Sequence, residues 1–200
     1  MKDNMKSKIR TMTFIALFSA VSIVLMIFEI SLPFMPDFIK FDFSDLPALI
    51  CAYAFGPLSG VLVCLLKNLL HLFMSQTAGI GELANFIMGS AFAFTAGIIY
   101  KLKKTRSGAL IASLSASAVM GIISFPVNYF IVYPLYSKIG FAKEAILGMY
   151  QVVKPSVSNL AQALLIFNVP FTMVKGILVA AIAFLIYKPL SPLLKGKYKK

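Results

Sequence analysis

The segment LAQALLIFNVPFTMVKGILVAAIAFLIY (residues 160–187) decides the fold class of this chain. It holds 28 residues and a single charged side chain, Lys175. A helix rises about 1.5 Å per residue, so this segment is long enough to cross the roughly 30 Å hydrocarbon core of a bilayer. It therefore predicts a membrane-spanning helix with Lys175 near its middle.

Five further apolar runs precede this segment. The predicted spans cover residues 11–32, 46–55, 58–75, 82–100, 107–136 and 160–187, and Gly56-Pro57 separates the second from the third. The chain is 60% hydrophobic and 13% charged, with a mean hydropathy of +0.88, whereas soluble domains carry about 25% charged residues. We predict an all-α membrane protein with six transmembrane helices, forming a single transmembrane domain over residues 1–200.

The distribution of the few charged residues predicts the orientation of these spans. Most Lys and Arg residues form three clusters: Lys2, Lys6, Lys8 and Arg10; Lys101, Lys103, Lys104 and Arg106; Lys188, Lys195, Lys197, Lys199 and Lys200. Six of the seven acidic residues lie between the clusters: Glu29, Asp37, Asp42, Asp45, Glu82 and Glu144. Because Lys/Arg-rich flanks tend to stay in the cytoplasm, we expect both termini there and loops 33–45, 76–81 and 137–159 outside. Juxtamembrane clusters also explain the net charge of +12 without a nucleic-acid partner.

Polar residues inside the apolar runs recur at helical spacing. Three stripes each share one helix face: Asn168, Thr172 and Lys175; Glu82, Asn85 and Gly89; Ser117, Gly121, Ser124 and Asn128. Polar groups at membrane depth are costly without partners, so we expect these faces to line a hollow that opens outward under the aromatic loop 33–45. The alternative is helix–helix packing, the ordinary use of small residues and amides in membranes.

The remaining polar residues and motifs do not predict an enzyme. Lys67 is expected to pair with an outer carboxylate or to contact a ligand, and His71 to pack at the membrane interface, because no second histidine stands at metal-ligand spacing. Cys51 and Cys64 fall in apolar runs and are expected to pack in the core rather than form a disulfide. The sequence has no GxxxxGK[ST], HExxH or GxSxG motif, so we expect no catalytic residues, no metal and no cofactor.

The segments FIKFDFSDLPALICAYAFGPLSGVLVCLLKNLLH (38–71), TAGIGELANFIMG (77–89), FPVNYF (125–130) and NVPFTMVKG (168–176) resemble a known family. They are similar to the substrate-binding (S) subunits of energy-coupling factor (ECF) vitamin transporters, and most of all to the riboflavin-specific type. The resemblance covers nearly the whole chain. It implies a multi-pass protein of the bacterial cytoplasmic membrane that captures riboflavin outside. A membrane scaffold (T) subunit and two cytoplasmic ATPases would then drive delivery inward.

The resemblance also implies which residues bind the vitamin, in a cavity formed by helices four to six and the first outer loop. The implied riboflavin contacts are Glu82, Asn85, Asn128, Asn168, Thr172, Lys175, Phe41, Asp42 and Phe43. Thr172 departs from the family pattern, which has Asn there, and Asn168 on the same face is the expected substitute. The family's scaffold contact, an Ala-xxx-Ala strip on helix one, falls on Ala16 and Ala20.

Two alternatives remain open from the sequence. The ligand of such a subunit could be another flat vitamin, since a loop phenylalanine and a helix-six amide suit several rings. The chain could instead be a stand-alone secondary transporter, although proton coupling usually needs a carboxylate at mid-membrane and Glu29 and Glu82 lie near the predicted outer ends.

Overall fold

The computed structural model describes residues 2–36 and 39–194, so Asp37, Lys195, Lys197, Lys199 and Lys200 lie outside the described residues. Its elements are α1 (Lys2–Ile27), β1 (Ile30–Ser31), β2 (Lys40–Phe41), α2 (Asp45–Phe55), α3 (Pro57–His71), the 3₁₀ turn η1 (Leu72–Met74), α4 (Ile80–Leu102), α5 (Arg106–Val127), the π-helical turn η2 (Asn128–Val132), α6 (Tyr133–Lys138), α7 (Lys143–Val153), α8 (Leu160–Ala163), the π-helical turn η3 (Leu164–Asn168) and α9 (Val169–Leu194).

The described part of the chain is all-helical apart from the short β1–β2 ladder. Five of its segments are long and apolar enough to cross a membrane: Ser7–Ile27, Pro57–Met74, Ile80–Leu102, Arg106–Lys138 and Leu160–Leu190. The remaining predicted span corresponds to α2, an apolar helix of 11 residues. A helix of that length measures about 16 Å, short of a full bilayer core. The all-α membrane fold is thus supported, with five spans by length and composition.

The first span ends earlier than predicted. Helix α1 stops at Ile27 rather than at residue 32, and β1 pairs antiparallel with β2. Glu29 leaves the helix and accepts a hydrogen bond from Lys40 Nζ at 2.5 Å. The helix ends before Ile30 because Ile30 and Ser31 pair with Phe41 and Lys40 in the ladder, and Pro33 also disfavours a helical conformation at residue 32. The predicted outer loop therefore starts from an anchored two-stranded ladder.

The predicted break between α2 and α3 forms at a glycine. Gly56 has φ of +104°, a conformation that side chains rarely adopt, and Pro57 follows at the start of α3. This corner packs closely on α4, because a Cβ on Gly97 would lie 2.8 Å from Pro57 Cα. The corner turns the short α2 back against its neighbours.

Helices α5 and α9 pack closely through small residues. A Cβ on Gly176 would lie 2.6 Å from Ser117 Oγ, and one on Gly121 would lie 2.1 Å from Met173 Cγ. Ser124 bonds within its own helix, to the carbonyl of Gly121 at 2.7 Å. Most of the small-residue stripe on α5 therefore serves helix packing, the alternative that the sequence left open.

The two cysteines take the predicted role. Cys51 and Cys64 are free and fully buried, in a core cluster shared by α1, α2, α3 and α4. Each behaves as a small apolar side chain there. The prediction of core packing without a disulfide is confirmed.

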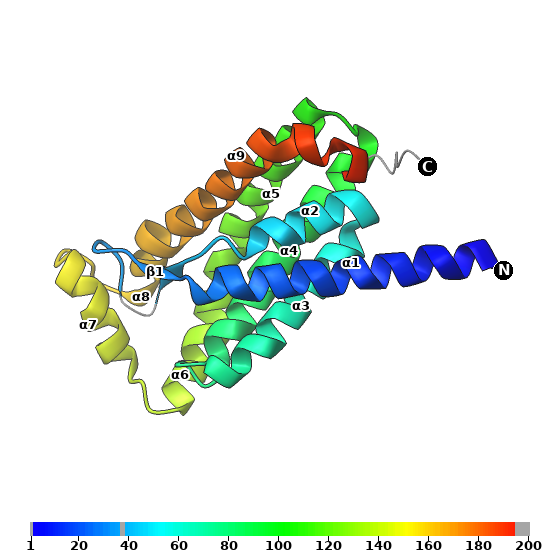
Figure 1. The fold of residues 1–200 in the computed structure, drawn as a ribbon. Coiled ribbons are helices and arrows are strands. Elements are labelled where there is room, and N and C mark those ends of the chain that lie inside the picture. The colour runs from blue at the N-terminus through cyan, green and yellow to red at the C-terminus, as the bar shows by residue number, and fades with distance from the viewer. Residues whose placement is uncertain (1, 37–38, 195–200) are drawn as a thin grey trace.

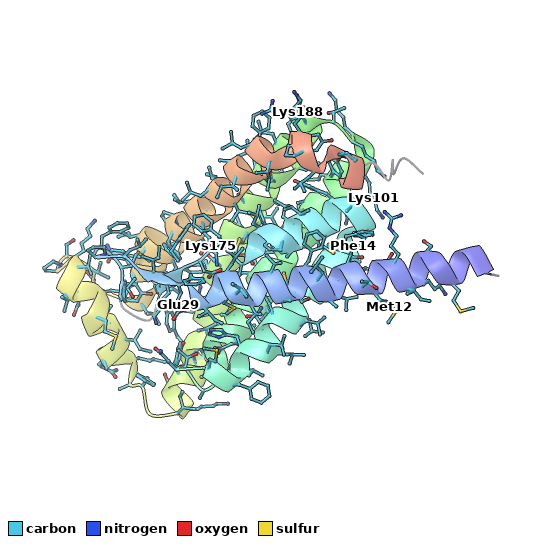
Figure 2. All side chains as sticks on the ribbon, in the orientation of Figure 1. Met12, Phe14, Glu29, Lys101, Lys175 and Lys188 are labelled. Atoms are coloured by element: carbon cyan, nitrogen blue, oxygen red, sulfur yellow. The ribbon has the colours of Figure 1, made fainter. Side chains whose placement is uncertain are left out.

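The start of α1 and the last turns of α9 lie at the same end of the molecule (Figure 1). Lys101 and Lys188 lie toward this end, whereas Glu29 lies toward the opposite end (Figure 2). Hydroxyl contacts join the helices at the basic end: Tyr53 donates to the carbonyl of Ala109 at 2.8 Å, and the hydroxyls of Tyr100 and Tyr187 lie 2.8 Å apart. Side-chain hydroxyls thus join the helices at the basic end, whereas β1 and α7 lie at the opposite end of the molecule (Figure 1).

Candidate ligand-binding site

The segment before α2 folds into a tight turn against α9. The backbone N–H of Ser44 donates to Asp42 Oδ1 at 2.7 Å, which fixes the turn. The Phe41 ring meets Phe43 edge-on at 4.9 Å and Phe171 of α9 at 6.3 Å, between ring centroids. The predicted contacts on the outer loop are therefore brought onto the helix that carries Lys175.

Four charged side chains form a buried cluster between this turn, α3 and α9. Lys175 Nζ donates to Asp42 Oδ2 at 2.8 Å and lies 3.3 Å from Asp45 Oδ2. Lys67 Nζ donates to Asp45 Oδ1 and to Ser44 Oγ, both at 2.6 Å. All four charged residues are buried. Two carboxylates balance two ammonium groups, which is what charges removed from water require.

The cluster keeps the loop carboxylate ionised. Burial alone would raise the pKa of Asp42, but the nearby Lys175 ammonium, with Lys67 and a hydrogen bond, outweighs it and lowers that pKa below its ordinary value. The sequence predicted that Lys175 would need an acceptor, and that Lys67 would pair with an outer carboxylate or contact a ligand. In the structure, both lysines pair with carboxylates. Asp45 was not predicted. Its signal was the small number of outer carboxylates available to two buried lysines.

Glu82 lies in the first turn of α4, in a separate hydrogen-bond network. Its Oε1 lies 2.8 Å from His71 Nδ1, and its Oε2 accepts from Ser75 Oγ at 2.8 Å and from Thr77 Oγ1 at 3.3 Å. The pairing of His71 with Glu82 was not predicted from the sequence, which gave His71 a packing role at the membrane interface. The histidine pairs with a carboxylate because α3 and α4 run side by side after the glycine turn that joins them.

Three other predicted polar contacts, Asn85, Asn128 and Thr172, make fewer hydrogen bonds to the protein. Asn85 is half-buried, with Nδ2 3.9 Å from Met26 Sδ, a weak contact. Asn128 is buried and donates to the carbonyl of Ser124 in its own helix at 2.7 Å. Thr172 is buried on the same helix as Lys175. These three residues are the predicted contacts with the most hydrogen-bonding capacity to offer a ligand.

Asn168 has a different role in the structure. Its Oδ1 accepts from Tyr150 on α7 at 2.6 Å, and its Nδ2 donates to the hydroxyl of Tyr133 at 3.3 Å. The two tyrosine hydroxyls also bond to each other. The Asn168 amide thereby connects the surface helix α7 to the bundle. Its expected role, to replace the ligand contact that an asparagine makes in the family where this chain has Thr172, stays a prediction.

A π-helical turn follows α5 and another precedes α9, and neither turn was predicted from the sequence. Turn η2 begins at Asn128 and turn η3 ends at Asn168. Pro134 and Pro170 each lie two residues beyond a turn, and each lacks the N–H that would bond the carbonyl four residues earlier. Widened turns of this kind frequently occur at functional sites. The repeated spacing of proline was the available signal.

The sequence predicted that Glu82, Asn128 and Lys175 line one outward-opening hollow, and this stays a prediction. The three side chains belong to three separate hydrogen-bond networks. Two apolar grooves open elsewhere, of about 520 and 600 Å³, and none of the three residues lines either groove. The networks are separate because buried polar groups are costly alone, so each takes the nearest protein partner, and the loop packs onto Lys175.

Comparison with known proteins identifies the relatives of this chain. The riboflavin transporter RibU of Staphylococcus aureus (strain TCH60) is 34% identical over 194 residues, 97% of this chain and 96% of that protein. The riboflavin transporter FmnP of Bacillus subtilis (strain 168) is 30% identical over 190 residues, 92% of this chain and 94% of that protein.

A solved structure has the same fold. The S component of a bacterial ECF transporter matches 94% of this chain and 99% of its own chain, with 31% sequence identity and a TM-score of 0.73. The sequence profile of the family described as "ECF transporter, substrate-specific component" matches residues 10–187. This chain belongs to the family of substrate-specific components of ECF transporters.

Proposed function

We propose that this chain is the riboflavin-binding subunit of an ECF-type, ATP-driven vitamin importer. The observation that carries the proposal is the meeting of the 41–43 segment with Lys175, in a chain 34% identical to a riboflavin transporter over 97% of its length. The subunit captures the vitamin outside the cell and delivers it inward with its partners.

The chemistry of the site suits riboflavin. The vitamin is uncharged, with a flat ring that carries carbonyl and nitrogen acceptors and a ribityl chain of hydroxyls. An ammonium group has three N–H donors, and Lys175 donates one to Asp42 while Asp45 Oδ2 lies 3.3 Å away without hydrogen-bond geometry, which leaves donor capacity for a ring carbonyl. The Asn128 amide would pair with the ring edge, and Phe41 would pack on the ring face. A mostly apolar site with a few placed polar groups is typical of small-molecule pockets.

Glu82 supplies an acceptor for the ribityl hydroxyls. Its carboxylate is held by His71 from α3 and by two hydroxyl side chains, Ser75 and Thr77. The ribityl hydroxyls of riboflavin would replace the hydroxyls of Ser75 and Thr77 as hydrogen-bond donors to Glu82. Asn85, one turn further along α4, offers a second polar group on the same face.

Binding requires the 39–45 segment to move. Phe41 and Asp42 are buried against α9, so a ring that contacts Lys175 must enter between the segment and the helix. The segment is joined to α1 through the two-residue β1–β2 ladder, the Glu29–Lys40 pair and a buried hydrogen bond from Ser22 Oγ to the carbonyl of Ser44 at 2.9 Å. We expect it to open outward and close over the bound vitamin.

We further propose that the chain crosses the bacterial cytoplasmic membrane six times, with α2 as the short sixth span and both termini in the cytoplasm. The basic residues Lys101 and Lys188 gather toward the end where α1 begins and α9 ends, and Glu29 lies toward the other (Figure 2). This separation of charge follows the positive-inside rule.

The proposed partners are a membrane scaffold subunit and two cytoplasmic ATPases. Ala16 and Ala20 are exposed on α1 and line an apolar groove of about 600 Å³ together with leucines of α3 and Phe73. Small residues beside such a groove let a helix of another membrane protein approach closely. We assign scaffold contact to this groove.

Titration of the purified full chain with riboflavin tests the proposal. We expect saturable quenching of flavin fluorescence at micromolar concentrations or below, and no competition from thiamine. Absence of saturable riboflavin binding would refute the ligand assignment, and tight thiamine binding would reassign it. Liposomes that hold this chain alone should bind riboflavin without accumulating it, since sustained uptake without ATPases would favour a secondary transporter.

A further inference from the structure

Lys67 is the most deeply buried charge of the described residues, and it lies on α3, outside the predicted vitamin contacts. Its side chain is 0% exposed, and its Nζ lies 2.6 Å from both Ser44 Oγ and Asp45 Oδ1. The other carboxylate oxygen, Asp45 Oδ2, faces Lys175 at 3.3 Å without hydrogen-bond geometry. Asp45 therefore bridges two ammonium groups that come from different helices.

We propose that Lys67 and Asp45 are positioning residues for riboflavin capture, which set the place and the charge balance of Lys175. This inference rests on the proposed function. Lys67 holds Asp45 to one side through its 2.6 Å hydrogen bond, so that only the more distant contact remains for Lys175. Lys175 then has one close carboxylate partner, Asp42, and keeps hydrogen-bonding capacity for a ligand.

The charge count explains why the pair matters. The cluster holds two positive and two negative groups. Without the Lys67 charge, two buried carboxylates would share one ammonium group, and Lys175 would be drawn into both. A donor committed to two anions in a low-dielectric site is a poor donor to an uncharged carbonyl. Removing the Asp45 charge as well would restore the balance between Lys175 and Asp42.

Gly89 on α4 leaves space for the Asp45 carboxylate beside Lys67, because glycine has no side chain. A Cβ on Gly89 would lie 2.8 Å from Asp45 Oδ1 and 3.3 Å from Cys64 Sγ. A side chain at this position would push the Asp45 carboxylate from Lys67. Gly89 thus offers a way to disturb the pair without changing any charge. Gly148 on α7 is a matched control, because nothing lies within 4 Å of a Cβ built there.

The test measures riboflavin Kd and ligand-free thermal stability for each full-length variant in detergent. We expect Lys67→Met to raise Kd at least tenfold, Lys67→Arg to raise it less, and the double variant Lys67→Met/Asp45→Asn to regain most of the lost affinity. Gly89→Ala should raise Kd severalfold, whereas Gly148→Ala should not. Lys188→Met is the matched lysine control, because Lys188 is exposed on α9 and lies outside the buried cluster of Asp42, Asp45, Lys67 and Lys175.

The outcomes distinguish failure of the proposed function from failure of the positioning role of Lys67 and Asp45. If the wild-type chain does not bind riboflavin, the proposed function fails, whatever the variants do. If it binds and folded Lys67→Met binds equally well, the positioning role alone is refuted. A double variant no better than Lys67→Met would refute the charge-balance reasoning and leave packing as the role of Lys67. Should Lys67→Met not fold, Gly89→Ala decides, and wild-type affinity in folded Gly89→Ala overturns the inference.

Discussion

Replacement of Lys175 by methionine separates the two roles that the structure gives this side chain. Lys175 is 6% exposed and contacts Asp42 at 2.8 Å and Asp45 at 3.3 Å. Removal of one partner from a buried ion pair costs about 3–5 kcal/mol of stability. Here we expect the lower value, about 3 kcal/mol, because Lys67 still pairs with Asp45 and the Ser44 N–H still bonds Asp42.

The effect on binding is a separate quantity. A hydrogen bond from a charged donor contributes about 1.5–3 kcal/mol, so Lys175→Met should raise the riboflavin Kd roughly 10- to 150-fold. The double variant Asp42→Asn/Lys175→Met removes a balanced pair of charges. It should recover much of the thermal stability but not the affinity, because the ligand donor is still missing.

The assay pairs a thermal unfolding scan without ligand and a fluorescence titration with riboflavin, both on monodisperse protein in detergent. Lys188→Met is the control, since Lys188 is exposed on the same helix and lies outside the buried cluster of Asp42, Asp45, Lys67 and Lys175. Unchanged affinity in Lys175→Met would remove Lys175 from the binding site. Full recovery of affinity in the double variant would mean that Lys175 only neutralises the loop carboxylate.

Three further substitutions test other parts of the structure. Ala16→Trp fills the α1–α3 groove, so uptake with the scaffold and ATPases should be lost while riboflavin Kd stays within about threefold; surviving uptake would place the scaffold contact elsewhere. Tyr150→Phe removes the hydroxyl that donates to Asn168, and should cost about 1 kcal/mol and speed hydrogen exchange in α7; unchanged exchange would argue against anchoring by this bond. Gly176→Val would place Cβ 2.6 Å from Ser117 Oγ, so overpacking should destabilise by about 1–3 kcal/mol, and added Ser117→Gly should restore stability; a wild-type unfolding temperature for Gly176→Val would contradict the close α5–α9 contact.

The membrane fold was predictable because a single physical requirement dominates it. Each span must bury about 20 apolar residues in lipid, and that requirement is written in consecutive positions of the chain. The break at Gly56 was predictable from the Gly56-Pro57 pair, because both residue types interrupt helices, and the φ of +104° at Gly56 agrees with it. The end of α1 was predicted wrongly, because the β1–β2 ladder depends on a partner strand further along the chain.

The partners of the site residues were predictable only as a class. A lysine at membrane depth requires an acceptor, and the sequence has few carboxylates to offer. Lys67 and Lys175 were therefore each expected to need a partner such as a carboxylate. Which carboxylate meets which lysine was not readable. His71 illustrates the limit, because the packing of α3 beside α4 gives it Glu82 as a partner, which the absence of a second histidine did not indicate.

The sequence by itself determined that this chain is an all-helical membrane protein and which residue types must avoid lipid, because these follow from local hydropathy and charge. Tertiary structure alone decided that Asp42 lies 2.8 Å from a lysine 133 positions away, and that Asp45 joins Lys67 to Lys175. A buried charge is stabilised by whichever opposite charge the packing of the helices brings within about 4 Å. Hydropathy along the chain carries no information about that distance.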